Sequence, residues 1–412
     1  GDVVPLVALA RELADRGTET LVLAHPEYTG IAHSHGIPCV SLGAGLIENG
    51  VDQRWAQRWI GNPVLASLAL RAWLRRIAHT LAPVLIEQIR VDDVVVTGVV
   101  GVATALTLAE ERGCRPVHVT FSATLPTAGP LAMMSAGTKY PRFNRWWTRH
   151  GVWAGSIRLG RPLDRVVRRR LRLPRRSSRA VAARALSMPV LVAASATLLP
   201  AQPDWPSNTL VTGAWELPVP QRPPDPCLVA WLDAHPRPVY LGFGSMLSPD
   251  PAADLRLVDG AARAAGVTVV YRPDDGAPAL ESTATVRVER DVDHRWLFPR
   301  CAAIIHHGGA GTTNTALAAG VPSVIVAHGF DQPLHGARLH QLGVGPKPLP
   351  RRALTVESLG QLLWDIARGP DRDGYVESAT RVGELVRRDH GVGAAADWLQ
   401  GRPGKAGGTS EP

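Results

Sequence analysis

Cysteine is scarce in this chain of 412 residues. The sequence holds only Cys39, Cys114, Cys227 and Cys301, far apart from one another. No two of them have the close spacing of a zinc site or of a disulfide framework. The scarcity of cysteine therefore indicates a reducing, cytoplasmic environment.

Long apolar runs are also missing. A membrane-spanning helix needs ~18–20 predominantly apolar residues. The nearest run, from Val94 to Ala109, is interrupted by Gly98 and Gly101. It predicts a buried strand that leads into a helix, and the sequence predicts no membrane-spanning helix.

Acidic residues are outnumbered by basic ones, 36 against 45, which gives a formal net charge of +9. Such an excess permits contact with nucleic acid, anionic lipid or a phosphorylated substrate, and does not choose among them. Much of the excess lies between Arg161 and Ala185. Two interpretations stay open for this stretch: a solvated arginine-rich helix surface, or a docking surface for an anionic membrane or acceptor.

Apolar, β-branched runs alternate with stretches of helical period, which predicts doubly wound α/β domains. Strands are expected at Thr20, Pro38, Asp93, Pro116 and Pro189, and again at Pro238, Val267, Ala284, Ala302 and Pro322. We assign residues 1–213 to an N-terminal domain and 228–400 to a C-terminal domain. The proline-rich segment 214–227 is the expected linker, and the polar, glycine-rich tail 401–412 is expected to be disordered.

The segment "HHGGAGTTN" joins the expected strand at Ala302 to a helix expected from Gly311. Glycines allow a close backbone approach and positive φ angles. The free N–H groups and the dipole of the helix then face outward, which is suited to a phosphate. Neither a Gly-Lys-Ser/Thr motif nor the dinucleotide-binding pattern is present. His306 and His307 are either structural residues or hydrogen-bond donors to a diphosphate.

Asp331 and Gln332 follow the next expected strand and precede another helix. A carboxylate beside an amide is suited to binding adjacent sugar hydroxyls. A simple helix-capping role is the alternative for Asp331. Together with the phosphate-type loop, the pair favours a nucleotide sugar as the ligand.

These motifs resemble those of nucleotide-sugar-dependent glycosyltransferases of the GT-B fold, specifically the bacterial antibiotic (macrolide and glycopeptide) enzymes and the sterol glucosyltransferases. The similarity spans nearly the whole chain, through "GDVVPLVALARELADRG", "VYLGFGS", "DHRWLFPRCAAIIHHGGAGTTNTALAAGVP" and "FDQPLHGARLHQLGVG". It implies two facing Rossmann-like domains, with the donor bound by the C-terminal one and the site in the cleft between them.

The resemblance also implies roles for individual residues. His294 and the backbone around Val292 would contact the nucleoside, and Ser245 would line the diphosphate. The sugar hydroxyls would be held by Asp331 and Gln332. The diphosphate and sugar would be bound by His307, Ala310, Gly311 and Thr312.

The family's catalytic base is an aspartate within "Ser-Arg-Gly-Asp" or a near variant, and Asp2 matches it. The implied mechanism is a single displacement with inversion, in which the carboxylate removes the proton of an acceptor hydroxyl. General-base help of this kind is worth ~10²–10⁴-fold. The family's first strand has no counterpart before Gly1, so the N-terminal sheet is expected to lack it.

The predicted function is therefore transfer of a hexose from a UDP- or dTDP-linked sugar to a hydroxyl of a lipophilic natural product, sterol or glycolipid. We expect neither a cofactor nor a metal, and no nucleic acid partner. A cytoplasmic location is expected, with peripheral membrane contact through residues 161–185 left open. The alternatives are a nucleotide-sugar epimerase of the same fold and a fragment that only binds the nucleotide sugar.

Other patterns in the sequence say less about function. The triplet Asp291-Val292-Asp293 is expected to cap a helix or to belong to the donor loop, and Asp371-Arg372-Asp373 to open a C-terminal helix, and neither is expected to bind a metal. His328, His335 and His340 are expected at the surface or packed on helices. For the tryptophan and arginine cluster "RFNRWWTRHGVWAG", we leave open ordinary packing, an apolar acceptor wall or membrane-facing patch, and stacking on nucleic acid bases.

Overall fold

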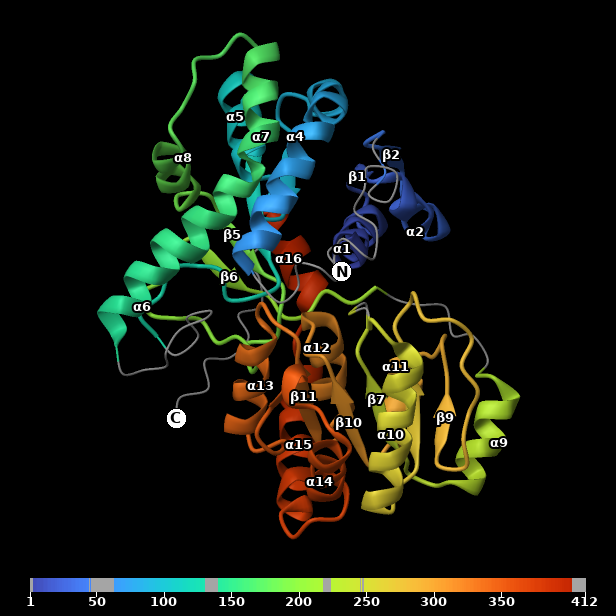
Figure 1. Cartoon of the computed structure of the whole chain (residues 1–412). Helices are drawn as coiled ribbons and strands as arrows, with labels where there is room; N and C mark the ends of the chain where they lie inside the picture. Colours follow the sequence, from blue (N-terminus) through green and yellow to red (C-terminus); the bar gives the residue numbers. More distant parts are fainter. Residues whose placement is uncertain are drawn as a thin grey trace. The chain divides into compact units, whose positions relative to one another are not determined.

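The computed structural model describes residues 3–43, 45, 63–129, 140–217, 224–244, 246 and 248–401. These residues divide into two compact units (Figure 1). The N-terminal unit contains the described residues up to 217 together with 389–401, and the C-terminal unit contains 224–388. Each is a mixed α/β unit built on parallel strands, as the alternating sequence pattern predicts.

The described strands of the N-terminal unit form two separate parallel sheets. One pairs β1 (Val22–Ala24) with β2 (Cys39–Ser41). The other has the order β3-β4-β5-β6, made of Val94–Thr97, Arg115–Thr120, Val190–Val192 and Thr209–Val211. The strand β6 is short and was not among the predicted ones. The absence of a first strand stays a prediction.

The helices of this unit are α1 (Val3–Asp15), α2 (Thr29–Ser34), α4 (Pro63–Gln88), α5 (Val102–Arg112), α6 (Pro141–Trp147), α7 (Ala154–Arg170), α8 (Ser178–Ala185) and α16 (Gly391–Leu399). A short 3₁₀ helix (Pro26–Tyr28) precedes α2, and a π-helical segment (Thr148–Trp153) joins α6 to α7. Helix α1 contributes to two cores: Val7 packs with residues of β1, and Leu9 packs with residues of β4 and β5. The hydrophobic faces of both sheets are thereby buried against one helix.

The C-terminal unit has one continuous parallel sheet, in the order β12-β11-β10-β7-β8-β9. Its strands are β7 (Val239–Gly242), β8 (Val269–Arg272), β9 (Val286–Val288), β10 (Ala303–His306), β11 (Ser323–Ala327) and β12 (Leu349–Pro350). The two-residue β12 was not predicted. All predicted strands of the second half are present.

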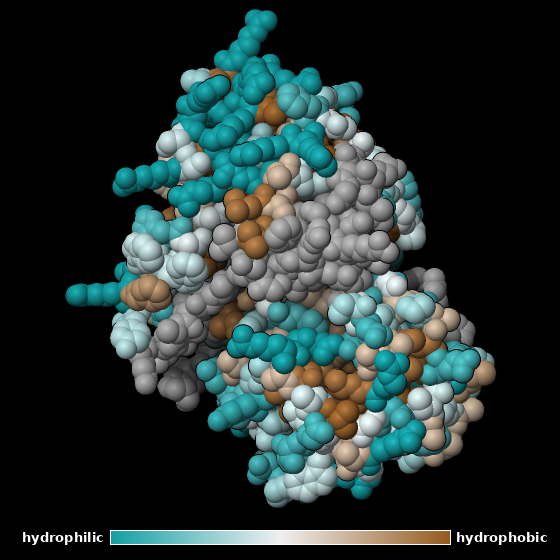
Figure 2. All heavy atoms as spheres, in the orientation of Figure 1, coloured by the Kyte–Doolittle hydropathy of each residue, from teal (hydrophilic) through white to brown (hydrophobic). Residues whose placement is uncertain are grey.

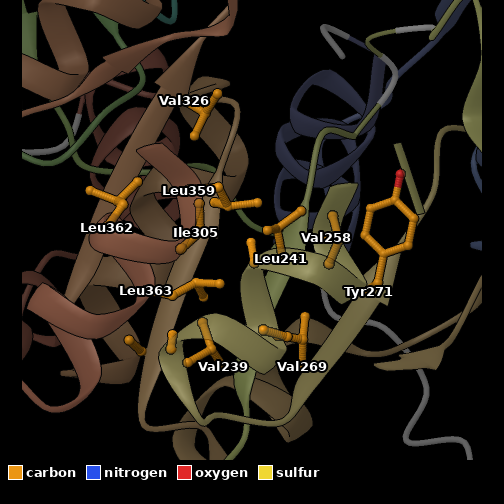
Figure 3. Packing of buried hydrophobic residues seen from close by; sticks show 14 of the residues in the cluster. Val239, Leu241, Val258, Val269, Tyr271, Ile305, Val326, Leu359, Leu362 and Leu363 are labelled. Atoms are coloured by element: carbon orange, nitrogen blue, oxygen red, sulfur yellow. The ribbon is translucent and has the colours of Figure 1, made fainter. Parts of the chain in front are cut away.

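Helices cover both faces of this sheet: α9 (Pro226–Ala234), α10 (Pro251–Ala265), α11 (His294–Leu297), α12 (Ala310–Ala319), α13 (Gln332–Gln341), α14 (Val356–Ala367) and α15 (Arg372–Arg387). Two 3₁₀ turns, Phe298–Arg300 and Arg351–Ala353, follow α11 and β12. Side chains alternate between the two faces, because successive strand residues point to opposite sides. Leu241 and Ile305 pack with Leu359 of α14 (Figure 3), whereas Tyr240 and Ile304 pack on the other face.

The domain boundary differs from the predicted one at the end of the second domain. The predicted segment 228–400 is too long, because α16 belongs to the N-terminal unit. Its Ala395 and Ala396 are buried in the core that contains Leu9, and Asp397 accepts a hydrogen bond from Arg16 at 2.5 Å. Apolar burial against a distant helix therefore determines where the last helix belongs.

Two arginines of the stretch 161–185 fit neither of its interpretations, whereas the others are exposed. Arg161 and Arg168 on α7 are buried, not solvated. Arg161 forms an ion pair with the fully buried Asp164, which also accepts a hydrogen bond of 2.5 Å from Thr107 of α5. Arg168 donates to the same hydroxyl of Thr107 at 3.1 Å. Part of the positive charge is thus used inside the unit.

Glu110 of α5 gathers further arginines at the edge of this network. Its carboxylate lies 3.2, 2.8 and 3.5 Å from Arg168, Arg176 and Arg184. The hydrogen bond from Arg176 is the largest cause that lowers the pKa of Glu110 to about 2. These contacts tie α5, α7 and α8 together across the arginine-rich stretch.

Candidate active site

The glycine-rich loop after β10 has the strand, turn and helix arrangement that the sequence predicts. Gly308 has φ +92°, and a Cβ there would lie 2.8 Å from Cγ2 of Ile325 on β11. Only glycine fits both demands. Helix α12 then begins at Ala310, and no described side chain caps its N-terminus. The N–H groups of the first turn, from Ala310 to Thr312, therefore remain available to an anion.

His307 lies at the centre of this loop and is buried. A Cβ on Gly244 would come within 2.5 Å of its ring, and one on Gly309 within 2.4 Å. The two glycines thus make room for the imidazole on both sides. Its Nδ1 is buried and has no hydrogen-bond partner among the described residues. Burial is the main cause that lowers the pKa of His307 to about 4, so the ring is neutral at neutral pH.

Two other histidines hold the peptide of Gly308 in place. His306 Nδ1 accepts a hydrogen bond from the N–H of Gly308 at 3.1 Å, and His335 Nδ1 lies 2.8 Å from its carbonyl oxygen. Both rings are fully buried. His306 is therefore a structural residue beneath the loop, and His335 is packed inside the unit rather than at the surface. Burial lowers the pKa of His306 well below its usual value.

Asp331 stands at the start of α13, directly after β11 and its loop. Its side chain makes no capping hydrogen bond to the helix, so the capping alternative is wrong for the carboxylate. The preceding residue, Phe330, has φ +57°, a left-handed conformation that is costly for a bulky residue. Strain of this kind concentrates at ligand sites, and here it sets the position of Asp331.

Gln332 is buried, and the two ends of its side-chain amide have different contacts. Its Oε1 accepts hydrogen bonds from the N–H groups of His328 at 2.6 Å and Gly329 at 3.2 Å. Its Nε2 lies 3.6 Å from Sδ of Met246, a weak contact. The carbonyl end therefore holds the loop after β11, while the amide N–H groups remain available to donate to a ligand.

The predicted nucleoside contacts lie at the start of α11. Asp293 caps the helix by accepting from the N–H of Arg295 at 2.9 Å, as expected for that triplet. His294 Nε2 lies 2.9 Å from the hydroxyl of Tyr240, and its ring stacks on Phe298 with 4.6 Å between centroids. Its imidazole is thus held inside the unit, and burial lowers its pKa to about 4.

Val292 is half-buried and packs against the cluster that contains Phe298. The second triplet opens α15, since Asp371 directly precedes this helix, but the Asp371 side chain makes no capping hydrogen bond and Asp373 pairs with Arg372. No group of three or more potential metal ligands occurs in the described part of the chain.

The sequence motifs did not indicate Arg272 as a residue of the site. It ends β8, and the strand register aligns it with Gly242 of β7, which in turn pairs with His306 of β10. Neighbouring strands lie about 4.8 Å apart, so Arg272 stands about 10 Å from the glycine-rich loop along the sheet edge. Its positive charge contributes to the lowered pKa values of His294 and His307. A cation that ends a buried strand, in "VTVVYR", was the available signal.

Two predicted residues, Asp2 and Ser245, lie outside the described residues. The others line the carboxyl edge of the sheet in the C-terminal unit, where ligands bind in α/β folds. Val292 and His294 lie at the start of α11, the glycine-rich loop follows β10, and Asp331 and Gln332 follow β11. The arrangement offers unpaired N–H donors, a neutral histidine and a carboxylate.

Comparisons with known proteins address the family directly. Residues 257–384 match the C-terminal domain model of the erythromycin biosynthesis protein CIII-like family. The glycosyltransferase GtfE of Amycolatopsis orientalis is 32% identical over 97% of this chain and 94% of its own length. The chain belongs to the GT-B glycosyltransferases.

Other relatives and structures agree. The vancomycin aglycone glucosyltransferase of Amycolatopsis orientalis is 40% identical to this glycosyltransferase over 50% of the chain and 48% of its own length. The sterol 3-beta-glucosyltransferase UGT80B1 of Arabidopsis thaliana is 27% identical over 96% of the chain and 65% of its own length. The solved glycosyltransferase of kitacinnamycin has a TM-score of 0.66 at 18% identity, covering 97% of this chain and 95% of its own, which supports the fold. The predictions of the GT-B fold and of the antibiotic and sterol glycosyltransferase family are confirmed.

Proposed function

We propose that this glycosyltransferase transfers a hexose from a nucleoside-diphosphate sugar to a hydroxyl of a lipophilic acceptor, with inversion at the anomeric carbon. Donor binding in this proposal rests on the loop around Gly308. There the unpaired N–H groups of α12 lie beside Nδ1 of His307, which is buried and has no partner among the described residues. Unsatisfied buried polar groups are rare in proteins and need a partner. A diphosphate fits the tautomer of His307 that carries its proton on Nδ1, because diphosphate oxygens only accept hydrogen bonds.

Charge balance at the leaving diphosphate follows from the pKa values. His307 is neutral at neutral pH, so it supplies a hydrogen bond rather than a charge. The positive contribution comes instead from the N-terminus of α12, because Arg272 at the same sheet edge is already paired with Asp275 at 2.7 Å. Stabilisation of developing charge by fixed groups is usually the largest catalytic term.

The sugar would be held by Asp331 and by the amide N–H groups of Gln332, each beside the loop. The attacking side depends on Asp2, which would remove the proton of the acceptor hydroxyl as that oxygen attacks the anomeric carbon. The bond from that carbon to the diphosphate oxygen breaks at the same time, and the nucleoside diphosphate leaves. No metal and no further cofactor take part in this scheme.

Relatives support the donor and acceptor classes. The solved VinC glycosyltransferase contains dTDP, and the solved Os79 variant contains UDP. Two relatives are described as acting on the vancomycin aglycone and on a sterol. We therefore propose a UDP- or dTDP-linked donor, an acceptor that is a natural product, sterol or glycolipid, and a cytoplasmic location.

The donor site is tested by calorimetric titration of UDP and dTDP into the purified protein and its variants. His307→Ala and Asp331→Ala address different parts of the donor, so the second is titrated with intact UDP-hexose and dTDP-hexose. Each should weaken binding about 10- to 100-fold, the effect of losing a hydrogen bond to a charged or buried group. Asp371→Ala, at the start of α15, is the matched control and should bind as the parent does.

Unchanged donor affinity in both variants would overturn the site. The reaction class is tested separately by incubating the protein with UDP-hexose, with and without a panel of lipophilic alcohols. Release of the nucleoside diphosphate that requires an acceptor supports transfer. Conversion of the sugar without an acceptor would identify the epimerase alternative, and binding without turnover would identify the binding fragment.

A further inference from the structure

Helix α6 and the first residue of the π-helical segment after it, Thr148, bury polar side chains, while α6 exposes aromatic ones. Asn144 and Thr148 are fully buried, and the hydroxyl of Thr148 bonds both the N–H and the carbonyl of Thr127 at 2.9 and 3.0 Å. Phe143 and Trp146, by contrast, are 49% and 57% exposed. A surface helix of a water-soluble unit normally buries its apolar face and exposes its polar one. This helix is anchored in the opposite sense.

The exposed rings form a row. Tyr140, which is 61% exposed, precedes Phe143 and Trp146 at three-residue spacing. The rings of Phe143 and Trp146 lie 6.1 Å apart, and Trp146 lies 5.9 Å from the ring of His150. Figure 2 shows hydrophobic and intermediate side chains among long hydrophilic ones over the region of α6, at the left edge of the molecule. We call these four residues the aromatic row.

Positive charge surrounds the aromatic row without acidic residues in the same stretch of sequence. Arg142, Arg145 and Arg149 alternate with the rings, and all three are exposed. Arg145 reaches Asp204 at 3.1 Å and is still 61% exposed. The sequence contains no aspartate or glutamate between Glu111 and Asp164. The row therefore faces solvent beside three arginines, of which only Arg145 is paired with a carboxylate in the described residues, that of Asp204.

The rest of the aromatic cluster is ordinary packing. Trp153 is buried, and its Nε1 donates to the carbonyl of Ala182 at 3.0 Å. The arginines of residues 161–185 are also partly committed, since Arg161 and Arg168 are buried and Glu110 holds two more. Helix α6 is thus better suited to meet a membrane than the stretch singled out by sequence.

We propose that the aromatic row and its flanking arginines bind the surface of an anionic lipid bilayer. Exposed aromatic rings of this kind enter the boundary between headgroups and acyl chains, where amphipathic side chains are favoured. Arg142 and Arg149 then meet the lipid phosphates, and each basic residue near such a surface strengthens binding about fivefold. The buried face of the helix keeps the rings pointed outward.

This surface gives the N-terminal unit access to lipophilic molecules dissolved in the membrane. Membrane binding itself does not depend on the proposed transfer reaction, because it needs neither donor nor acceptor. It is therefore measured on the protein alone, and its failure leaves the donor-site test untouched.

The experiment is co-sedimentation of the purified full chain with extruded vesicles. Vesicles of phosphatidylcholine containing a minority of phosphatidylglycerol are compared with vesicles of phosphatidylcholine alone. Phe143→Ala/Trp146→Ala should weaken binding to the anionic vesicles at least tenfold. Arg142→Gln/Arg149→Gln should also weaken it at least tenfold and remove most of its salt dependence. Arg145 is left unchanged because it holds Asp204.

The matched controls replace similarly exposed side chains on other helices. Trp364→Ala replaces a tryptophan that is 42% exposed on α14, and Arg169→Gln/Arg170→Gln removes two exposed arginines at the end of α7. Both should bind as the parent does. The proposal is overturned if the parent does not bind anionic vesicles, or if controls and test variants lose binding equally. Binding of a single-stranded oligonucleotide in place of vesicles would also overturn it and identify a nucleic acid surface.

Discussion

The sheet of the C-terminal unit is continuous over six strands, whereas the described strands of the N-terminal unit form sheets of two and four. The continuous sheet brings the ends of β7, β8, β10 and β11 to one edge, where the glycine-rich loop lies. In the N-terminal unit, α1 serves both sheets through separate cores. The continuous sheet of the C-terminal unit thus brings ligand-binding groups together at one edge. The two sheets of the N-terminal unit instead share apolar contacts with α1 in two separate cores.

The two units also bury polar groups differently. In the N-terminal unit both carboxylate oxygens of Asp164 have partners, Thr107 and Arg161. In the C-terminal unit the buried polar groups include the histidines at the glycine-rich loop, and Nδ1 of His307 and Nε2 of His306 have no partner among the described residues. In the N-terminal unit, Nε of Arg161 and Nη2 of Arg168 also lack a partner among the described residues. An unpaired buried atom therefore points to a ligand only where it also lies at the carboxyl edge of a sheet, as His307 does.

The largest expected difference between the units is their sensitivity to acid. Burial is the main cause of a lowered pKa in four histidines of the C-terminal unit, His294, His306, His307 and His328. Among the described residues of the N-terminal unit, only His118 has a pKa lowered in this way. A histidine with a lowered folded-state pKa stays neutral while the unfolded chain is protonated, so stability is lost as pH falls below about 6.5.

Each such histidine should lower the free energy of unfolding by on the order of 1–2 kcal/mol between about pH 7 and about pH 5. With four against one, the C-terminal unit should lose several kcal/mol more. Urea unfolding monitored by hydrogen exchange and mass spectrometry separates the two units. His328→Gln should reduce the pH dependence of the C-terminal unit only. Equal pH dependence of both units would contradict the comparison.

The next largest effect is expected from the ion network of the N-terminal unit. Asp164→Ala leaves the buried Arg161 without its carboxylate, and breaking such a pair costs about 3–5 kcal/mol in the free energy of unfolding. Arg184→Ala is the control, because its side chain is 42% exposed and lies 3.5 Å from Glu110. Exposed pairs contribute about 0–1 kcal/mol.

Both variants are measured by urea unfolding at neutral pH, with nucleotide titration as a second readout. Donor affinity should be unchanged in Asp164→Ala under conditions where it remains folded. If Asp164→Ala destabilises the unit no more than Arg184→Ala does, the network is not a stabilising core element.

The smallest effect is expected at the hydrogen bond between Tyr240 and His294. Tyr240→Phe removes the hydroxyl that lies 2.9 Å from Nε2 of His294, and a single hydrogen bond contributes about 0.5–1.5 kcal/mol. Nucleotide affinity should fall less than tenfold, because α11 keeps its stacking of His294 on Phe298.

Tyr271→Phe is the matched control, since Tyr271 is buried on the opposite face of the same sheet (Figure 3). It should leave the signal of His294 unchanged in proton NMR titrations, whereas Tyr240→Phe should shift it. A shift in both variants would mean that the effect spreads through the sheet rather than through the hydrogen bond.

Local patterns were sufficient for most elements of the fold. The strands predicted at Pro238, Ala302 and Pro322 are present as β7, β10 and β11, because a buried parallel strand is written in the chain as a short apolar run. The loop at Gly308 was also predicted, since glycine spacing after a strand is a local signal. The short strands β6 and β12 were missed. Strand β12 has only two residues, one of them a proline, and β6 lies just before the proline-rich segment 214–227.

The features of the site and of the domain division that the sequence did not predict have one physical origin. That His335 fixes the carbonyl of Gly308, or that Gln332 binds the loop at His328, depends on contacts between elements. For Arg272 the sequence showed a cation at the end of a buried strand, and the sheet register then placed it beside Gly242.

The amino-acid sequence by itself determined the family, the alternation of strands and helices, and the residues of the donor loop, because glycine conformation and side-chain chemistry are local properties. Tertiary structure decided which arginines are buried, to which unit α16 belongs, and which face of α6 points to solvent. Those outcomes depend on burial and ion pairing between segments far apart in the chain, such as Arg16 with Asp397, and no single segment encodes them.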